Sequence, residues 1–241
     1  AASIASTRTS LKVSNTLAAS GGENAQSLNE IKATALAFRN SQSRIVTKQD
    51  LVARIYAMPS KFGRVFRAGV RSNSSNPLSS TISIISRDIK GHLMISPDTL
   101  KENLKLFLND YRLITDAYDI VDTQVINLKI MYSVVIDSKS NSEITLQAIN
   151  KKIKAYMRLE NFQIDQPILQ SDIVNIIINA SGVLSLVTFE VLNMSGVVDD
   201  RVYSDSTFSV TSNTDRGIIL PPDGSIFEVK YPADDIIGVA R

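Results

Sequence analysis

The sequence predicts an α+β fold built around one long strand, and three observations lead to this class. First, in the stretch Gln124 to Asp137 every even-numbered position from Ile126 to Ile136 is apolar, an alternation that predicts a strand with one face in a core. Second, amphipathic helical patterns lie on both sides of this stretch. Third, the predicted elements run α-β-β-α-β and then α-(short β)-α-β. We expect ferredoxin-like split βαβ units that share the long central strand, with a β-rich C-terminal extension.

The 241 residues divide into four predicted parts. Residues 1–26 are rich in Ser, Ala, Thr and Asn and form a linker or an edge segment, in which the apolar residues are spaced as in a short strand: Leu11, Val13 and Leu17. Residues 27–137 form a first α+β unit, and residues 138–192 form a second unit that packs on the long strand. Residues 193–241 carry short β-like runs between turns, and we expect this extension to be less compact than the middle of the chain.

Composition excludes several classes of protein. The chain contains no Cys, so disulfides and thiolate chemistry are absent, and 44% hydrophobic with 21% charged residues is typical of a globular protein. No apolar window is long enough to span a membrane. The N-terminus has neither an initiator Met nor a signal peptide, so we expect a fragment of a longer protein.

Charge is divided unevenly along the chain. The first 100 residues hold 13 Lys or Arg and 5 Asp or Glu, whereas the remainder holds 13 Lys or Arg and 19 Asp or Glu. This asymmetry suits contact between neighbouring subunits, and chance scatter of solvated charges explains it equally well.

Two helices precede the first strand. The first covers residues 27–40, with its apolar residues on one stripe: Leu28, Ile31, Ala35 and Phe38. In the second, Thr47 and Asp50 have the spacing of an N-terminal capping box, and Pro59 ends the helix.

The rest of the first unit alternates strands with one helix. We expect strands over residues 62–71 and 81–88, joined by a polar loop over residues 72–80. Ser96 as N-cap and Pro97 at the first helical position predict a helix through Tyr111. The long strand follows, and its extended character can begin as early as Ala117.

The second unit is predicted to contain two helices and a strand. The first helix covers residues 142–159, and a short extended segment follows over residues 164–169. The second helix begins at Ser171 or Asp172, ends near Ala180, and is apolar on nearly all sides, which indicates burial between two layers. A strand over residues 183–192 completes the unit. Shorter β-like runs cover residues 201–211 and 225–231 in the extension.

No pattern indicates catalysis, a cofactor or a metal site. The single His, His92, has no Cys or second His as a co-ligand, so we expect a structural or solvated role. Motifs for phosphate loops, dinucleotide binding and a nucleophile elbow are missing. The acidic pairs Asp199-Asp200 and Asp234-Asp235 consist of neighbours that point to opposite faces of an extended chain. Asp116, Asp119 and Asp122 share a spacing of three and are interpreted as solvated. The protein is therefore not expected to be an enzyme.

An alternative function is nucleic-acid binding by the basic strand Lys61–Arg71. Its cations surround Phe62 and Phe66, and basic residues with aromatics can hold phosphates and stack bases. On a strand, however, Arg67 and Arg71 share one face while Phe66 lies on the other. An edge that faces solvent or a partner therefore fits the pattern better.

The stretch from Ala33 to Val70 resembles the signature region of the baseplate J-like family, the wedge proteins of contractile phage tails. That family has an Ala-rich helix, then Arg-x-Val-Thr-x-x-Asp-Tyr opening a second helix, then a Pro-containing turn and a strand. The matching residues here are Arg44, Val46, Thr47, Asp50, Pro59 and Val65. Leu51 stands where an aromatic is usual, and Ser181 departs from the Pro that often precedes Gly-Val later in the family.

The resemblance covers roughly residues 27–192 and extends to the C-terminal part of the larger wedge proteins, such as those of T-even phages. It implies a virion structural protein of the tail baseplate, assembled in the host cytoplasm without a membrane or nucleic acid. Members of the family form homodimers, contact other wedge proteins and link wedges into a ring that holds while the baseplate triggers sheath contraction. By this resemblance, Arg44, Val46, Thr47, Asp50 and Pro59 serve the fold.

Apolar content and turn spacing predict the interface elements. They are the strand over residues 183–192 and the extension after Asn193. The residues that we expect at an interface are Val183, Val187, Phe189, Val191, Phe208 and Phe227.

Overall fold

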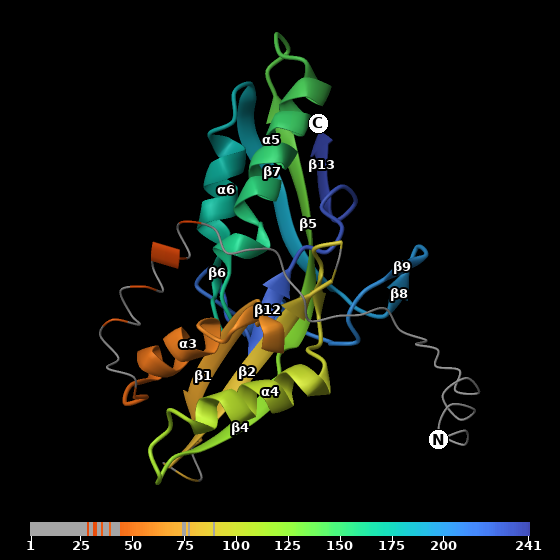
Figure 1. The fold of residues 1–241 in the computed structure, drawn as a ribbon. Coiled ribbons are helices and arrows are strands. Elements are labelled where there is room, and N and C mark those ends of the chain that lie inside the picture. The colour runs from red at the N-terminus through yellow and green to blue at the C-terminus, as the bar shows by residue number, and fades with distance from the viewer. Residues whose placement is uncertain are drawn as a thin grey trace, which may run out of the picture.

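The computed structural model describes residues 28, 31–32, 35, 39, 44–73, 76, 78–88 and 90–241 (Figure 1). The predicted short strand with Leu11, Val13 and Leu17 lies outside these residues, as does Phe38 of the first predicted helix. The described members of that helix are helical, but Leu28 and Ile31 are 75% and 46% exposed. Their stripe is therefore not buried against the described part of the chain.

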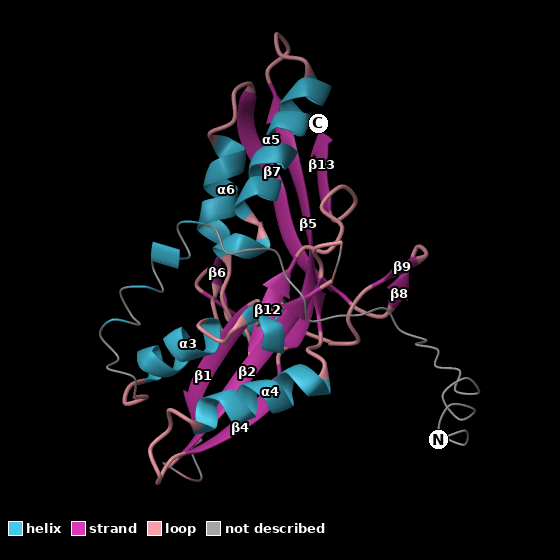
Figure 2. Ribbon diagram, viewed as in Figure 1, coloured by secondary structure: helices cyan, strands magenta, loops and turns pink. Residues whose placement is uncertain are grey.

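Helices and strands are mixed as predicted, and the α+β class is confirmed (Figure 2). The elements of the first unit are α3 (Lys48–Tyr56), the 3₁₀ helix η1 (Ser60–Phe62), β1 (Arg67–Ser72), β2 (Ser79–Arg87), β3 (Leu93–Met94), α4 (Asp98–Asn109) and β4 (Ala117–Asp122). β2 pairs antiparallel with β1, parallel with β4 and, at its end, antiparallel with β3. In a split βαβ unit another strand lies between the two parallel strands. Here β2 and β4 pair directly, so the unit β2-α4-β4 is not split.

The core of the first unit lies between its sheet and two helices. α3 and α4 cover the same face of the sheet (Figure 1). Leu51 and Ile55 of α3 and Leu104 of α4 pack against Ile82 and Ile84 of β2, and all five are at most 2% exposed.

The long strand exists as β5 (Gln124–Ile136), and its even-numbered residues fill the core as predicted. Ile126, Leu128, Ile130, Tyr132 and Val134 are between 0% and 2% exposed. The extended chain does begin at residue 117, but one residue divides it into two strands. β4 belongs to the first sheet and β5 to a second one, so this segment links the two units.

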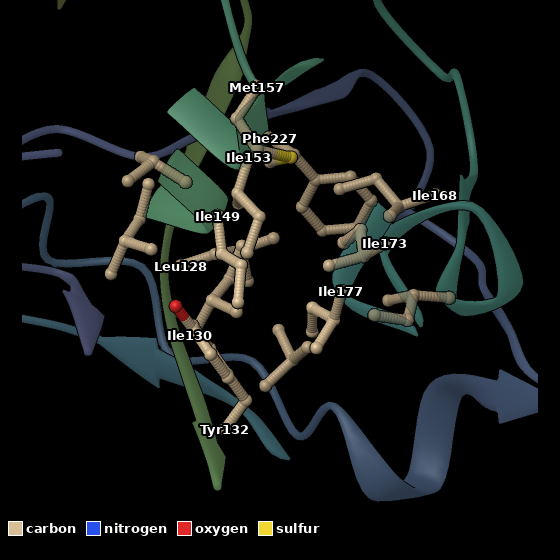
Figure 3. Packing of buried hydrophobic residues seen from close by; sticks show 14 of the residues in the cluster. Leu128, Ile130, Tyr132, Ile149, Ile153, Met157, Ile168, Ile173, Ile177 and Phe227 are labelled. Atoms are coloured by element: carbon tan, nitrogen blue, oxygen red, sulfur yellow. The ribbon is translucent and has the colours of Figure 1, made fainter. Parts of the chain in front are cut away.

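The second unit packs two helices on one face of the β5 sheet. Its elements are α5 (Ser142–Tyr156), the 3₁₀ helix η2 (Leu159–Asn161), β6 (Ile168–Leu169), α6 (Gln170–Ile178) and β7 (Val183–Met194), which is antiparallel to β5. Figure 3 shows Ile149 and Ile153 of α5 and Ile173 and Ile177 of α6 pointing toward Leu128 and the other labelled core residues.

Helix α6 is not enclosed between two layers as its composition predicted. Ile173 and Ile177 are at most 1% exposed, but Ile178 is 46% exposed. The helix packs on β7 and α5 by one face only, so an apolar outer face remains in solvent.

The C-terminal extension is rich in strands, but its two main strands are built into the core. β12 (Ser225–Glu228) and β13 (Ile236–Ala240) both pair parallel with β5, and every residue of β12 is buried. The expectation of a less compact extension is therefore corrected. The reason is that the pairing partner lies about a hundred residues earlier in the chain, where local periodicity gives no information.

The remaining elements of the extension are short. They are β8 (Val197–Val198), β9 (Arg201–Val202), the 3₁₀ helix η3 (Thr211–Asn213), β10 (Thr214–Asp215) and β11 (Ile218–Ile219). β8 and β9 form a hairpin that projects from the body (Figure 1). β10, β11 and β6 form a small sheet beside the second unit.

Two local predictions in the first unit need correction. Residues 60–62 form η1, and the strand begins only at Arg67, so Phe62 lies outside it. α4 begins after Pro97, and no side chain caps it, because the Ser96 hydroxyl hydrogen bonds instead to the hydroxyl of Ser86 at 2.9 Å.

The two units are joined by a buried arginine and an apolar cluster. Arg67 of β1 is 8% exposed, and its Nε and one Nη donate to the backbone oxygens of Phe162 and Glu160, each at 3.0 Å. A third core cluster beside it takes residues from both units and from the extension: Phe66, Ile85, Leu93, Ile164 and Ile226. The contact between the units is thus both apolar and hydrogen bonded.

Two further polar connections reinforce this junction. Arg71 of β1 pairs with Asp165 at 2.6 Å and with Asp223 at 2.8 Å. Glu228 of β12 accepts a hydrogen bond from the Leu93 amide of β3 at 3.0 Å. Because these contacts arise from four separate segments, the two units form one body.

Candidate interaction surface

The predicted capping motif is formed as expected at the start of α3. The Thr47 hydroxyl accepts from the Asp50 amide at 3.1 Å, and the Asp50 carboxylate accepts from the Thr47 amide at 2.9 Å. These hydrogen bonds lower the pKa of Asp50, because they favour its charged form. Of the other motif residues, Arg44 and Val46 precede this cap and Pro59 follows the opposite end of the helix, and all three are exposed.

The basic strand does not present a row of cations to solvent. Arg67 is buried against backbone oxygens of the second unit, and Arg71 is held by Asp165 and Asp223. Lys61 lies over the ring of Phe62, 4.7 Å from its centroid. Arg67 and Arg71 are thus used within the fold, and the geometry gives the nucleic-acid alternative no support.

The acidic pairs near the C-terminus have structural roles. Asp199 and Asp200 form the turn of the β8–β9 hairpin, both with positive φ. Asp234 pairs with Arg201 at 2.9 Å, and buried Asp235 accepts from the Tyr203 hydroxyl at 2.7 Å. In the part of the chain that the structure describes, no group of three or more His, Cys, Asp or Glu could hold a metal ion.

His92 lies beside a buried carboxylate. Its Nδ1 is 3.9 Å from Glu228, its ring contacts Tyr231, and burial lowers its pKa. Glu228 is 2% exposed and also accepts from the Asn127 side chain at 2.9 Å. Desolvation raises the pKa of Glu228, and its hydrogen bonds oppose this only in part.

Strand β7 forms an edge of the second sheet and carries two irregularities. Its pairing with β5 shifts twice, which leaves Val187 and Leu184 without partners on β5. Such bulges bend a strand and redirect side chains. Here they expose apolar residues, since Leu184 is 66% and Val187 is 44% exposed.

The face of the sheet opposite α5 and α6 is open along β7, β5 and β13. Leu192, Met131 and Val239 on this face are 43%, 36% and 52% exposed. A hollow of about 180 Å³ lies over these strands, lined by Met131, Tyr132, Ser133, Thr188, Glu190, Ile237, Val239 and Arg241. The Ser133 hydroxyl in this hollow is buried and has no hydrogen-bond partner among the described residues.

We call Leu184, Val187, Leu192, Met131 and Val239 the β7 surface. Exposed apolar side chains gathered on one edge and one face of a sheet are typical of interaction sites. The surface also carries charges of both signs, because Glu190 and Arg241 both line the hollow.

The predicted interface residues divide between this surface and the core. Of the six, Val187 belongs to the β7 surface. Val183, Phe189 and Phe208 are partly buried and pack against the core, whereas Val191 and Phe227 are 8% and 1% exposed and belong to it. Phe227 is therefore not available to a partner in the folded chain.

The sequence did not indicate the other members of the β7 surface. Alternation along the strand pointed to Val183, Val187, Phe189 and Val191 as one face, but a bulge after Leu186 changes which residues point outward. Val239 escaped notice because its strand is recognisable only by its pairing with β5.

The β8–β9 hairpin offers a second, smaller apolar group. Val197 and Val202 pair across the hairpin and are 71% and 58% exposed. None of the described helices is long and apolar enough to cross a membrane.

Comparisons with known proteins give a match in structure but none in sequence. No family model matches the chain, and no curated protein matches it. Among solved structures, the chain is similar to a protein in the cryo-electron microscopy structure of the anti-feeding prophage baseplate, with a TM-score of 0.51 and 8% identity over 70% of this chain. The match spans 38% of that protein, so the chain corresponds to less than half of its length. At this identity the similarity establishes a shared fold.

Proposed function

We propose that this protein is a structural component of a contractile-tail baseplate. The observation that carries the proposal is the shared fold with a chain of the anti-feeding prophage baseplate, found independently of the sequence motif at residues 44–59. The motif supports membership of the baseplate J-like family, and the capping box that it requires is formed by Thr47 and Asp50.

The junction between the units supports a mechanical role. A component that stays assembled while a baseplate changes shape must transmit force without separation of its own parts. Arg67, Arg71 and Glu228 connect the two units, and a shared apolar cluster packs between them. Such a body moves as one rigid unit, so a change in the shape of the baseplate must alter the contacts between this body and neighbouring subunits.

The β7 surface is the proposed contact with a second copy of the chain. A two-fold dimer uses the same patch on both subunits, so the patch must complement itself. The β7 surface combines apolar side chains with Glu190 and Arg241, which lets opposite charges meet across a two-fold axis. Homodimers of this kind then link neighbouring wedges into a ring around the tail, as in the family that the motif resembles.

Subparticle fractionation tests the baseplate role. Contractile particles from the source organism are separated into sheath, tube and baseplate fractions, and the chain is quantified in each by peptide mass spectrometry. We expect it in the baseplate fraction, in constant ratio to other baseplate proteins. A chain recovered only outside the particles contradicts the proposal.

A further inference from the structure

A groove lies where β3, the start of β5 and the end of β12 meet the segment over residues 203–207. Its volume is about 570 Å³, which is in the range of sites for small ligands. No residue of the β7 surface lines it, so the two features are separate. Its lining combines apolar side chains, among them Met94 and Ile95, with the carboxylates of Asp205 and Glu228.

Glu228 is a buried carboxylate without a charged partner in close contact. It is 2% exposed, and its oxygens accept from the Leu93 amide at 3.0 Å and from the Asn127 side chain at 2.9 Å. Both donors are neutral. The Nδ1 of His92 lies 3.9 Å away, but burial lowers the pKa of His92 and so disfavours its charged form. A buried anion in such surroundings is costly, and a cation beside it would reduce the cost.

The other charges around Glu228 do not supply this cation. Lys230 lowers the pKa of Glu228 and Asp88 raises it, so these two groups act in opposite directions. Within the lining itself, Glu228 and Asp205 carry negative charge and Lys230 carries positive charge. Asp205 is exposed and forms no ion pair with any residue that the structure describes. The groove therefore carries a net negative charge.

A second polar group in the lining is unsatisfied. Thr123 is 3% exposed, and its hydroxyl has no hydrogen-bond partner in the described part of the chain. Buried hydroxyls are normally hydrogen bonded. The Thr123 hydroxyl is therefore available to a ligand in the groove, independently of the charge of Glu228.

We propose that this groove binds an aliphatic cation, an alkyl guanidinium or alkyl ammonium. Its N–H groups donate to Glu228, whose oxygens each have a lone pair beyond those used by Leu93 and Asn127, and to the Thr123 hydroxyl. Its alkyl part covers Ile95, which is 62% exposed. A guanidinium fits this chemistry best, because it presents several donors in one plane.

Two ligands of the same shape test the role of charge. Butylguanidinium and butylurea differ in that only the first is a cation. Each is titrated into the full chain at pH 7, and binding is followed by the NMR shifts of backbone amides. Butylguanidinium should shift amides of residues 93–95 and 123–127 and bind at least about tenfold more tightly than butylurea, since a charge-assisted hydrogen bond contributes roughly 1.5–3 kcal/mol.

Three substitutions assign the effect to the groove. Glu228→Gln removes the charge and keeps an acceptor for the Leu93 amide, and it should reduce the affinity for butylguanidinium to that for butylurea. Asp205→Asn, at an exposed position, should weaken binding about twofold, and it tests the site even if Glu228→Gln destabilises the fold. The matched control is Asp110→Asn, an exposed carboxylate outside the groove, which should leave the affinity unchanged.

The same cation can belong to a free small molecule or to an arginine of a neighbouring protein. A capped Gly-Arg-Gly peptide separates these sources. Binding of the peptide more tightly than butylguanidinium assigns the cation to a protein, and weaker binding assigns it to a free ligand; both support the proposal. Equal affinities for butylguanidinium and butylurea, or no saturable shift in the groove, overturn it. Neither readout depends on association through the β7 surface or on a baseplate role.

Discussion

Substitution of Arg67 by Ala provides the sharpest test of the junction between the two units. Arg67 is 8% exposed and donates to Phe162 O and Glu160 O across the junction, each at 3.0 Å. Its guanidinium also lies 4.4 Å from the centroid of the Phe66 ring. The change removes these contacts and leaves a backbone oxygen without a donor at a buried position.

The expected loss follows from the two bonds across the junction. Hydrogen bonds to a charged group contribute about 1.5–3 kcal/mol each, and the Glu160 bond is only partly buried and counts for less. We therefore expect Arg67→Ala to lower the free energy of unfolding by about 3 kcal/mol. Arg67→Lys keeps the charge but has a single donor nitrogen in place of the guanidinium fork, and it should recover part of this loss.

Urea unfolding followed by circular dichroism and by tyrosine fluorescence measures the effect. The matched control is Arg158→Ala, which removes an exposed arginine and should change stability by less than about 0.5 kcal/mol. The two probes should also separate in Arg67→Ala if the units begin to unfold one by one. Equal stabilities of Arg67→Ala and Arg158→Ala would refute the reasoning.

Three further predictions concern single residues. Thr47→Ala removes the N-cap of α3 and should cost about 1 kcal/mol in urea unfolding, whereas Thr47→Ser should be nearly neutral; equal losses would contradict the cap. Burial raises the pKa of Glu228, so the folded protein holds this proton more tightly, and stability should fall as the pH rises from below 4.5 through the folded pKa. Glu228→Gln should lack this fall when the two proteins are compared by unfolding across pH, and identical pH profiles would exclude the effect. Gly238→Ala places a Cβ against the ring of Tyr132 and should cost about 2 kcal/mol in thermal unfolding, and an unchanged melting temperature would mean that β13 does not pack on β5 as described.

Local patterns in the sequence predicted the parts of the fold that local interactions determine. The alternation in β5 reports burial of one face directly, so the strand was identified within one residue of its end. The Thr47–Asp50 cap is a contact over three residues and was identified for the same reason.

Elements that depend on distant partners could not be predicted in this way. The predicted run over residues 225–231 contains β12, but nothing in it indicated pairing with β5, and the five residues of β13 carried too little pattern to be predicted. Both strands pair with one edge of β5, and β7 pairs with the other. The burial of Arg67 was equally invisible, because its partners are backbone oxygens more than ninety residues away. The β7 surface depends on two bulges, which shift the alternation that sequence analysis assumes.

The most direct test of association through the β7 surface is the mass of the chain in solution. Light scattering after size exclusion, across protein and salt concentration, should give a dimer of twice 26.4 kDa. Val187→Lys should reduce it to a monomer, and Ile144→Lys, a change of the same kind on α5, should leave the dimer intact. A strict monomer at all concentrations, or a dimer that Val187→Lys leaves unchanged, would contradict association through this surface.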